Sequence, residues 1–157
     1  MKKYILGKII LFISIIIFLF SSIALAQNKT LGIGVIVGKP TGLSCKYWLS
    51  QGTAIDFAAE WSFGDRESGH IHGDYLLHRF DLVKIEERSF IVSYGIGARI
   101  WFKEDEDTRV GIRIPISLAY MFSRDPFEVF IEGAPIIDIA PKTKLDHNLG
   151  LGVRFYF

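Results

Sequence analysis

Apolar residues alternate with polar or small residues over long stretches of this chain. The clearest stretch lies between Arg109 and Phe122, where every second residue is apolar. Successive side chains of a β-strand point to opposite faces, so this period of two predicts one long strand with an apolar face. It is longer than the usual strand of about five or six residues, and it reaches the roughly 9–11 residues that a strand needs to cross a bilayer obliquely.

The same alternation predicts eight strands joined by short polar connections. Their ranges are 31–37, 43–49, 55–63, 70–83, 90–102, 109–122, 127–139 and 148–157. Helical spacing is absent over any useful length. Because the connections are short, neighbouring strands are expected to pair antiparallel in chain order, as a meander.

Two features predict local irregularity in this sheet. The alternation changes phase within 70–83, which favours a bulge of one extra residue near His78 and Arg79. Pro115 and Pro135 lie within predicted strands, and each removes a hydrogen-bond donor from the ladder, so irregular pairing is expected beside both.

The two faces of the predicted strands differ sharply in composition. One face is almost entirely aliphatic and aromatic, whereas the other mixes small residues with charges of both signs. A lysine or arginine on a lipid-facing surface costs up to about 2–4 kcal/mol at the bilayer midplane, so an apolar face in lipid requires the charges to point inward. A soluble barrel of the lipocalin type has the reverse polarity and is the alternative. The residues expected to face the lumen with a structural role are Asp56, Glu60, Arg99, Arg113, Glu128, Glu132, Asp138 and Arg154.

An eight-stranded barrel is only wide enough for its side chains to fill it. The three inward arginines are therefore expected to pair with the inward carboxylates, because buried ions need partners. Glycines on the same face leave room for these long side chains. A filled lumen disfavours the alternative of an ion path, which would be a pore of very small conductance.

The start of the chain predicts export. Lysines 2, 3 and 8 form a positive region, an apolar run follows from Ile9 to Phe20, and Ala24-Leu25-Ala26 offers a small-residue cleavage site. We expect residues 1–26 to be a signal peptide cleaved after Ala26, with a retained membrane helix as the alternative. The remaining 27–157 are expected to form one β-barrel domain.

Charge and cysteine content exclude several classes of protein. The formal net charge is +1, and removal of the three leader lysines takes it to −2 (1 − 3), which gives no basic footprint for nucleic acid. A single cysteine, Cys45, excludes an internal disulfide. The sequence indicates no cofactor.

The last strand ends in alternating apolar residues and a terminal phenylalanine. This pattern resembles the C-terminal signature of bacterial outer-membrane proteins, which implies recognition of Val153, Phe155 and Phe157 by the barrel-assembly machinery. A wider likeness is carried by the stretches 72–78, 94–99, 113–115, 128–135 and 150–157. Through them the chain resembles a family of small spirochaete outer-membrane barrel proteins, with an architecture similar to the OmpA transmembrane domain. That resemblance implies an outer-membrane barrel and no established enzymatic chemistry.

Two groups of residues have the composition of a chemical site. His70, His72 and Asp74 lie on one strand face and need a ligand from a neighbouring strand to hold a transition metal. We favour a purely structural role for them, so no metal site is predicted. A lipid-modifying acyl hydrolase or transferase would need Ser62 or Ser68 to act with these residues at one rim, and their spacing matches no nucleophile motif.

The sequence therefore predicts an eight-stranded antiparallel transmembrane barrel in a bacterial outer membrane. Its expected role is structural or in surface interactions, without catalysis. Expected partners are outer-membrane lipid, the assembly machinery and a host or envelope ligand at the outer loops, and the barrel is expected to be a monomer. The connections near Lys39, Gly64, Lys103 and Pro141 are expected to face the outside, where the acidic run from Lys103 to Asp107 forms a solvated loop.

Overall fold

The structure, a computed structural model, describes residues 30–39, 41–62, 68–85, 88–103 and 106–157. The predicted signal peptide, residues 1–26, lies outside the described residues, as do Phe63 and much of the 64–69 connection. No helix in the described part is long and apolar enough to cross a membrane. The strands are β1 (Leu31–Lys39), β2 (Thr41–Trp48), β3 (Thr53–Ser62), β4 (Ser68–Ile85), β5 (Arg88–Lys103), β6 (Arg109–Arg113), β7 (Ile116–Met121), β8 (Phe127–Ala140) and β9 (Lys144–Tyr156).

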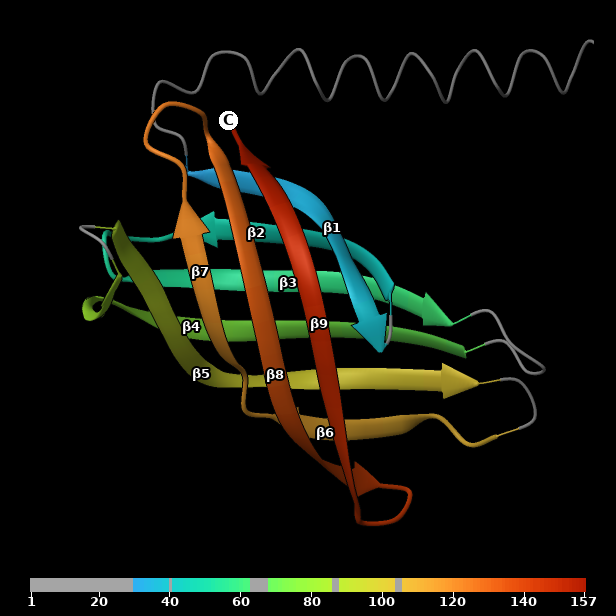
Figure 1. The fold of residues 1–157 in the computed structure, drawn as a ribbon. Coiled ribbons are helices and arrows are strands. Elements are labelled where there is room, and N and C mark those ends of the chain that lie inside the picture. The colour runs from blue at the N-terminus through green and yellow to red at the C-terminus, as the bar shows by residue number, and fades with distance from the viewer. Residues whose placement is uncertain (1–29, 40, 63–67, 86–87, 104–105) are drawn as a thin grey trace, which may run out of the picture.

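These strands form one antiparallel sheet that closes on itself. Consecutive strands pair with one another except β6 and β7, which together fill the place between β5 and β8, and β1 pairs with β9. Figure 1 shows the strands running around a common interior. The all-β, antiparallel, up-and-down prediction is confirmed, with eight positions around a closed, barrel-like ring.

The prediction of one continuous strand over 109–122 is wrong, because Pro115 divides it into β6 and β7. Proline has no N–H for the ladder, so pairing there changes its pattern. The Gly95 N–H donates to the Pro115 carbonyl at 3.0 Å, and the Ile114 N–H donates to the Pro135 carbonyl at 3.0 Å. Pro115 and Pro135 thus both lie where the pairing with β8 passes from β6 to β7. β8 itself runs through Pro135 without a break.

The irregularity in β4 lies just after the predicted place. The β4–β5 pairing shifts between Arg79 and Val83. The four residue steps from Arg79 to Val83 on β4 lie opposite the two steps from Val92 to Phe90 on β5. The shift therefore adds two residues to β4, and the predicted single-residue bulge was one residue short. This part of β4 is exposed at the end of the ring.

β9 begins at Lys144, earlier than the predicted start at residue 148, and pairs with β8 along the whole of that extension. At its other end the strand closes the ring. Phe157 lies one residue beyond β9, and its N–H donates to the Leu31 carbonyl at 2.9 Å. The C-terminus is therefore fastened to the first strand.

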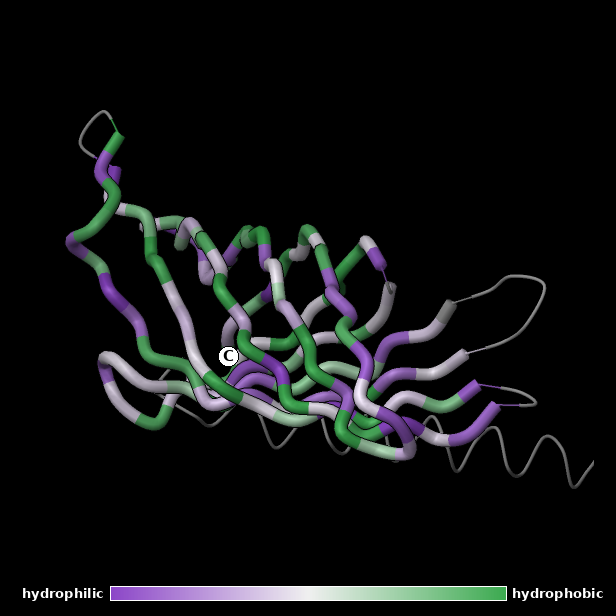
Figure 2. The backbone as a smooth tube through the Cα atoms, turned by 90° about the horizontal axis from the view of Figure 1, so that it is seen from below, coloured by the Kyte–Doolittle hydropathy of each residue, from purple (hydrophilic) through white to green (hydrophobic). Residues whose placement is uncertain are grey.

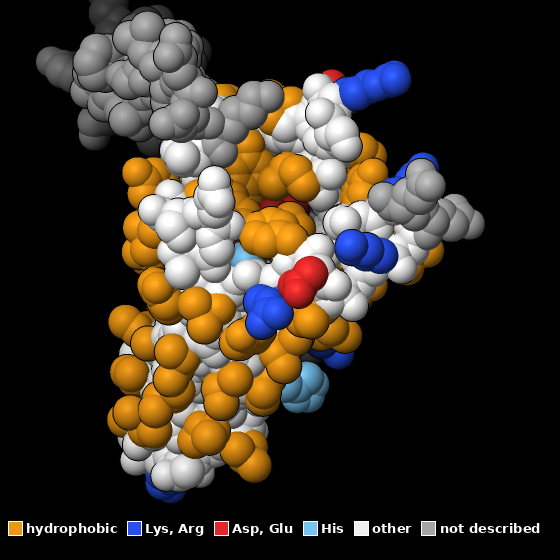
Figure 3. Space-filling view, turned by 90° about the vertical axis from the view of Figure 1, so that its left-hand side faces the viewer, with side chains coloured by type: hydrophobic (Ala, Val, Ile, Leu, Met, Phe, Trp, Pro, Cys, Tyr) orange, Lys and Arg blue, Asp and Glu red, His pale blue; other side chains and the backbone are white. Residues whose placement is uncertain are grey.

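The alternation places charges inside and apolar side chains outside. Figure 2 shows the alternating hydropathy along the strands, and Figure 3 shows hydrophobic side chains gathered on the face that it presents. Ile96, for example, is 60 % exposed, whereas Arg113 on the neighbouring strand is fully buried. A small apolar cluster in the interior contains Ile36, Ile91 and Phe130. The polarity is thus the reverse of that in a soluble globular protein.

Candidate functional site

Strand register brings the charged residues of the interior together. Residues that pair directly across strands share a face, and Asp56 pairs with Asp74, which pairs with Gly97, which pairs with Arg113. A carboxylate row and an arginine therefore meet on the inner face. Gly97 makes this approach feasible, since a Cβ at that position would lie 1.9 Å from Asp74 Oδ1.

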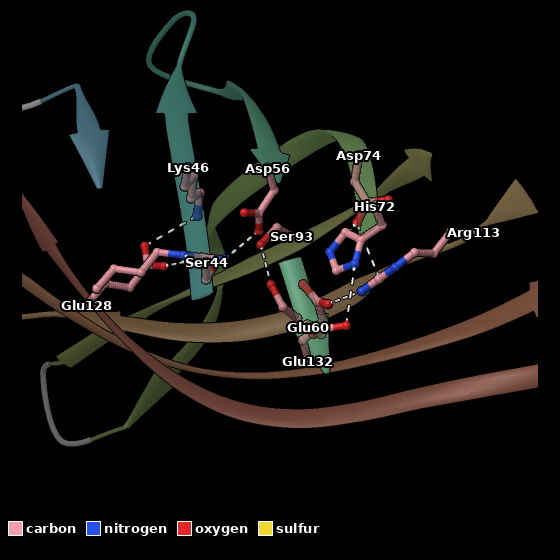
Figure 4. Close-up of polar contacts among 12 residues, drawn as sticks. Ser44, Lys46, Asp56, Glu60, His72, Asp74, Ser93, Arg113, Glu128 and Glu132 are labelled. Atoms are coloured by element: carbon pink, nitrogen blue, oxygen red, sulfur yellow. Dashed lines mark hydrogen bonds and ion pairs between the residues drawn. The ribbon is translucent and has the colours of Figure 1, made fainter. Parts of the chain in front are cut away.

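The interior near the chain termini is organised around Arg154. Its Nε donates to Ser44 Oγ at 2.9 Å, its Nη1 to Glu128 Oε1 at 2.7 Å and its Nη2 to Asp56 Oδ2 at 2.5 Å. The guanidinium also lies over the ring of Phe130, 3.8 Å from the centroid. These contacts connect four strands through one side chain, and Figure 4 shows several of the partners.

Glu128 has further partners in the same layer. Lys46 Nζ donates to Glu128 Oε2 at 3.3 Å, and the Tyr156 hydroxyl donates to the same oxygen at 2.9 Å. Lys46 also lies over the Trp48 ring at 4.7 Å. Both Lys46 and Glu128 are buried, so their charges balance one another away from water.

The middle layer combines an arginine, three carboxylates and two imidazoles. Arg113 donates to Glu132, and its Nη1 lies 3.4 Å from Asp74 Oδ2. His72 lies beside these residues, with its Nε2 3.6 Å from Asp74 Oδ2. Glu60 Oε2 faces the imidazoles of His72 and of the adjacent His70 (Figure 4 shows Glu60 and His72).

The third layer lies near the opposite end of the ring. Arg99 donates to both oxygens of Asp138, from Nε at 3.0 Å and from Nη2 at 2.8 Å. The same Nη2 donates to Asp146 at 2.7 Å. A cavity of about 670 Å³ opens beside this layer, and its lining includes His70 and Asn148.

The structure places all eight predicted lumen charges in the interior, each at most 4 % exposed. Sequence reasoning left six further buried ionisable side chains of the described chain out of that set, although the residues from 70 to 78 share one alternation phase that could have identified four of them. The six are Lys46, His70, His72, Asp74, His78 and Tyr156. Val153 of the predicted assembly signal faces outward, and Phe155 and Phe157 are partly exposed at the end of the chain.

Of the two serines of the enzyme hypothesis, the structure describes the side chain of Ser68 alone. Ser68 borders the same cavity as His70, but in the described part of the chain no hydrogen bond links Ser68 to an imidazole. The Ser62 side chain lies outside the described residues. The nucleophile–base contact that such catalysis requires is therefore not made by Ser68 in the described part of the chain.

Part of the 103–107 connection is held by ion pairs. Glu106 accepts hydrogen bonds from Lys103 at 2.6 Å and from Arg109 at 2.8 Å. The hydrogen bond from Lys103 outweighs desolvation and, with the bond from Arg109, holds the pKa of the Glu106 carboxyl below its usual range. Arg109 also lies over the Trp101 ring at 4.1 Å. Residues 104–105 lie outside the described part.

A closed antiparallel ring with ion pairs inside and apolar side chains outside defines a class of all-β protein with inverted polarity. The chain belongs to a family described as proteins of unknown function, DUF3996, whose model matches residues 23–157. No curated protein and no solved structure matches the chain.

Proposed function

We propose that the protein is an outer-membrane β-barrel with a structural or surface-interaction role. The observation that carries this proposal is the inverted polarity of the closed ring. Large apolar side chains exposed to water around a whole protein would be strongly unfavourable, whereas lipid solvates them well. A closed ring also satisfies the backbone hydrogen bonds that an open sheet edge would leave bare in hydrocarbon.

The length of the apolar surface fits a bilayer. Along β8 the outward side chains run from Phe127 to Ile139, both exposed. Twelve steps of about 3.4 Å give roughly 41 Å along the strand, and a tilt of about 40° leaves roughly 31 Å along the axis. The hydrocarbon core of a bilayer is about 30 Å thick.

Exposed aromatic residues lie at both ends of this surface. Phe122 and Phe127 flank the β7–β8 turn, and Trp61 and Phe102 lie near the ends of β3 and β5 at the opposite rim. Aromatic girdles at the two lipid–water interfaces are typical of transmembrane barrels. The outward face thus has the composition of a surface with an apolar middle and aromatic borders.

The leader and the last strand support the location. A cleaved signal peptide over residues 1–26 would deliver residues 27–157 to the periplasm of a bacterium with two membranes. Val153, Phe155 and Phe157 would then be recognised by the assembly machinery, and outer-membrane lipid would surround a monomeric barrel. The resemblance to small spirochaete barrels and to the OmpA transmembrane domain agrees with this location.

The packed interior favours a scaffold over a pore. Arg99, Arg113 and Arg154 each bridge at least two carboxylates from different strands, so charged side chains cross the lumen at three levels. The connections after β1, β3, β5 and β8 share the end away from the termini, which would be the outer end. Exposure there makes these connections the place where a host or envelope ligand would bind.

Heat modifiability tests the proposal directly. The full chain refolded in detergent is expected to give a β-type far-UV circular dichroism spectrum and a band that shifts on a denaturing gel when boiled. A water-soluble protein with no shift would contradict the membrane assignment. Acyl release from lipid A would instead identify an enzyme, and stable single-channel currents in planar bilayers would identify a pore.

A further inference from the structure

The middle layer contains three buried ligand-type side chains, those of Glu60, His70 and His72, whose donor atoms converge. Glu60 Oε2 lies 3.2 Å from His70 Nδ1 and 3.7 Å from His72 Nδ1. Ligand atoms about 2.1 Å from a tetrahedral zinc ion lie roughly 3.4 Å apart, so these separations already match a coordination sphere. One atom from each residue falls within 4.8 Å of the others, and all three residues are buried.

Several of these buried atoms have no hydrogen-bond partner. Within the described chain, the converging atoms Glu60 Oε2 and His72 Nδ1 have no hydrogen-bond partner, and neither has Nε2, the second imidazole nitrogen of His70. Buried polar atoms in native proteins almost always have a partner, and an exception points to a missing water or ion. The Glu60 side chain is 2 % exposed, and no lysine or arginine of the described chain lies within ion-pair distance of it.

The charge balance of the interior points the same way. The buried side chains include four cations and six carboxylates, which leaves a formal excess of two negative charges. The partly exposed Asp146, which pairs with Arg99, is a further carboxylate outside this count. The cations are Lys46, Arg99, Arg113 and Arg154, and the carboxylates are Asp56, Glu60, Asp74, Glu128, Glu132 and Asp138. One divalent cation would neutralise the excess.

We propose that Glu60, His70 and His72 bind a divalent transition-metal ion. Two imidazoles and one carboxylate suit zinc and neighbouring ions better than calcium or magnesium, which prefer oxygen ligands alone. A second convergent group, His72 with Asp74 and Glu132, is the weaker site because Arg113 already occupies the space beside both carboxylates.

Access and a fourth ligand are both available at this position. His70 borders the cavity of about 670 Å³ at the loop end, so an ion that enters this cavity meets the site first at His70. Asn148, which also borders the cavity, has its side-chain amide 3.2 Å from His70 Nδ1. A flip of the amide would present its oxygen to the same ion.

The sequence alone favours a structural role for His70, His72 and Asp74, since it identifies no further ligand from a neighbouring strand. The β3–β4 register supplies it, because Glu60 pairs directly with His70. The proposal does not depend on membrane insertion. It requires only the closed ring and its interior.

Zinc binding by the refolded full chain tests the proposal. We expect one equivalent of Zn²⁺ per chain after desalting, measured by mass spectrometry of the metal, and a visible Co²⁺ spectrum with nitrogen ligands. Glu60→Gln and His72→Gln should each weaken Zn²⁺ binding by at least about 100-fold in calorimetry, since even outer-shell substitutions cost 10–100-fold. The fold of each variant is checked by heat modifiability.

His78→Gln is the matched control, because His78 is a buried imidazole of the same interior that packs on Trp48 instead. It should leave Zn²⁺ binding unchanged. A wild-type chain that folds but binds no Zn²⁺ would overturn the proposal, and protons would then balance the interior. Binding that survives Glu60→Gln and His72→Gln but is lost in His147→Gln would also overturn it, by placing the ion at the cavity mouth. If both variants fail to fold, the wild-type Co²⁺ spectrum is the test: nitrogen ligands support the proposal, and their absence overturns it.

Discussion

Replacement of Arg154 by leucine should severely destabilise the folded ring. This residue is 3 % exposed, and its guanidinium donates hydrogen bonds to Ser44, Asp56 and Glu128. Leucine fills part of the volume and leaves the carboxylates in place. Glu128 keeps Lys46 and Tyr156 as partners, whereas Asp56 loses its only cation within ion-pair distance in the described chain. The damage should therefore concentrate on Asp56.

The size of the effect follows from this loss. A hydrogen bond to a charged group contributes about 1.5–3 kcal/mol, and removal of one partner of a buried ion pair costs about 3–5 kcal/mol. We expect Arg154→Leu to lower the free energy of unfolding by about 4 kcal/mol, a shift of nearly a thousandfold in the folding equilibrium. Adding Asp56→Asn should recover part of the loss, because the bare charge is then gone.

Urea unfolding in detergent micelles, followed by tryptophan fluorescence, measures this difference by linear extrapolation. Arg79→Leu is the matched control, since Arg79 pairs with Asp81 at an exposed position and should contribute little. If Arg154→Leu were no more destabilising than Arg79→Leu, the interior ion pairs would not support the fold. A double variant as unstable as Arg154→Leu alone would show that Asp56 is not the group left bare.

Three further predictions concern the outer face, the inner glycines and the loop end. Ile114→Arg places a charge on an outward position that is 43 % exposed and should abolish the heat-modifiable band, whereas the inward Ser117→Ala should keep it; equal tolerance would refute the assigned facing. Gly97→Leu would drive its side chain into Asp74 and should cost at least about 1–3 kcal/mol in the same urea assay, and an unchanged midpoint would refute the close packing. The Glu106 carboxyl should titrate below the pKa of glutamate in an unfolded peptide, as measured by carbon NMR. Its contribution to stability is then present at neutral pH and is lost as the pH falls through the lowered pKa. A normal titration midpoint would refute the two hydrogen bonds that this carboxyl accepts.

Much of the fold follows from short-range sequence pattern. The alternation around Arg113 and Arg154 assigns each residue a face without knowledge of any other strand, because side chains alternate along every strand. The division at Pro115 was partly foreseen, since a missing ladder donor predicts irregularity. That it separates two strands, opposite Pro135 on β8, depended on where β8 came to lie.

The partners of the inward charges could not be predicted in the same way. Alternation states that Glu60 and His70 point inward, but only the β3–β4 register makes them neighbours. Arg99 likewise reaches Asp146 because β9 begins earlier than its apolar pattern suggests. Such pairings depend on the register of every seam and on the closure of the ring.

The sequence by itself determined the strands, their faces and the inverted polarity, because these are properties of a single extended segment and its period of two. Only the tertiary structure decided which carboxylate meets which arginine, and that Glu60 and His72 converge with His70. The physical reason is that a strand fixes the direction of a side chain locally. Its contacts are fixed by strands that are distant in sequence, once the ring has closed.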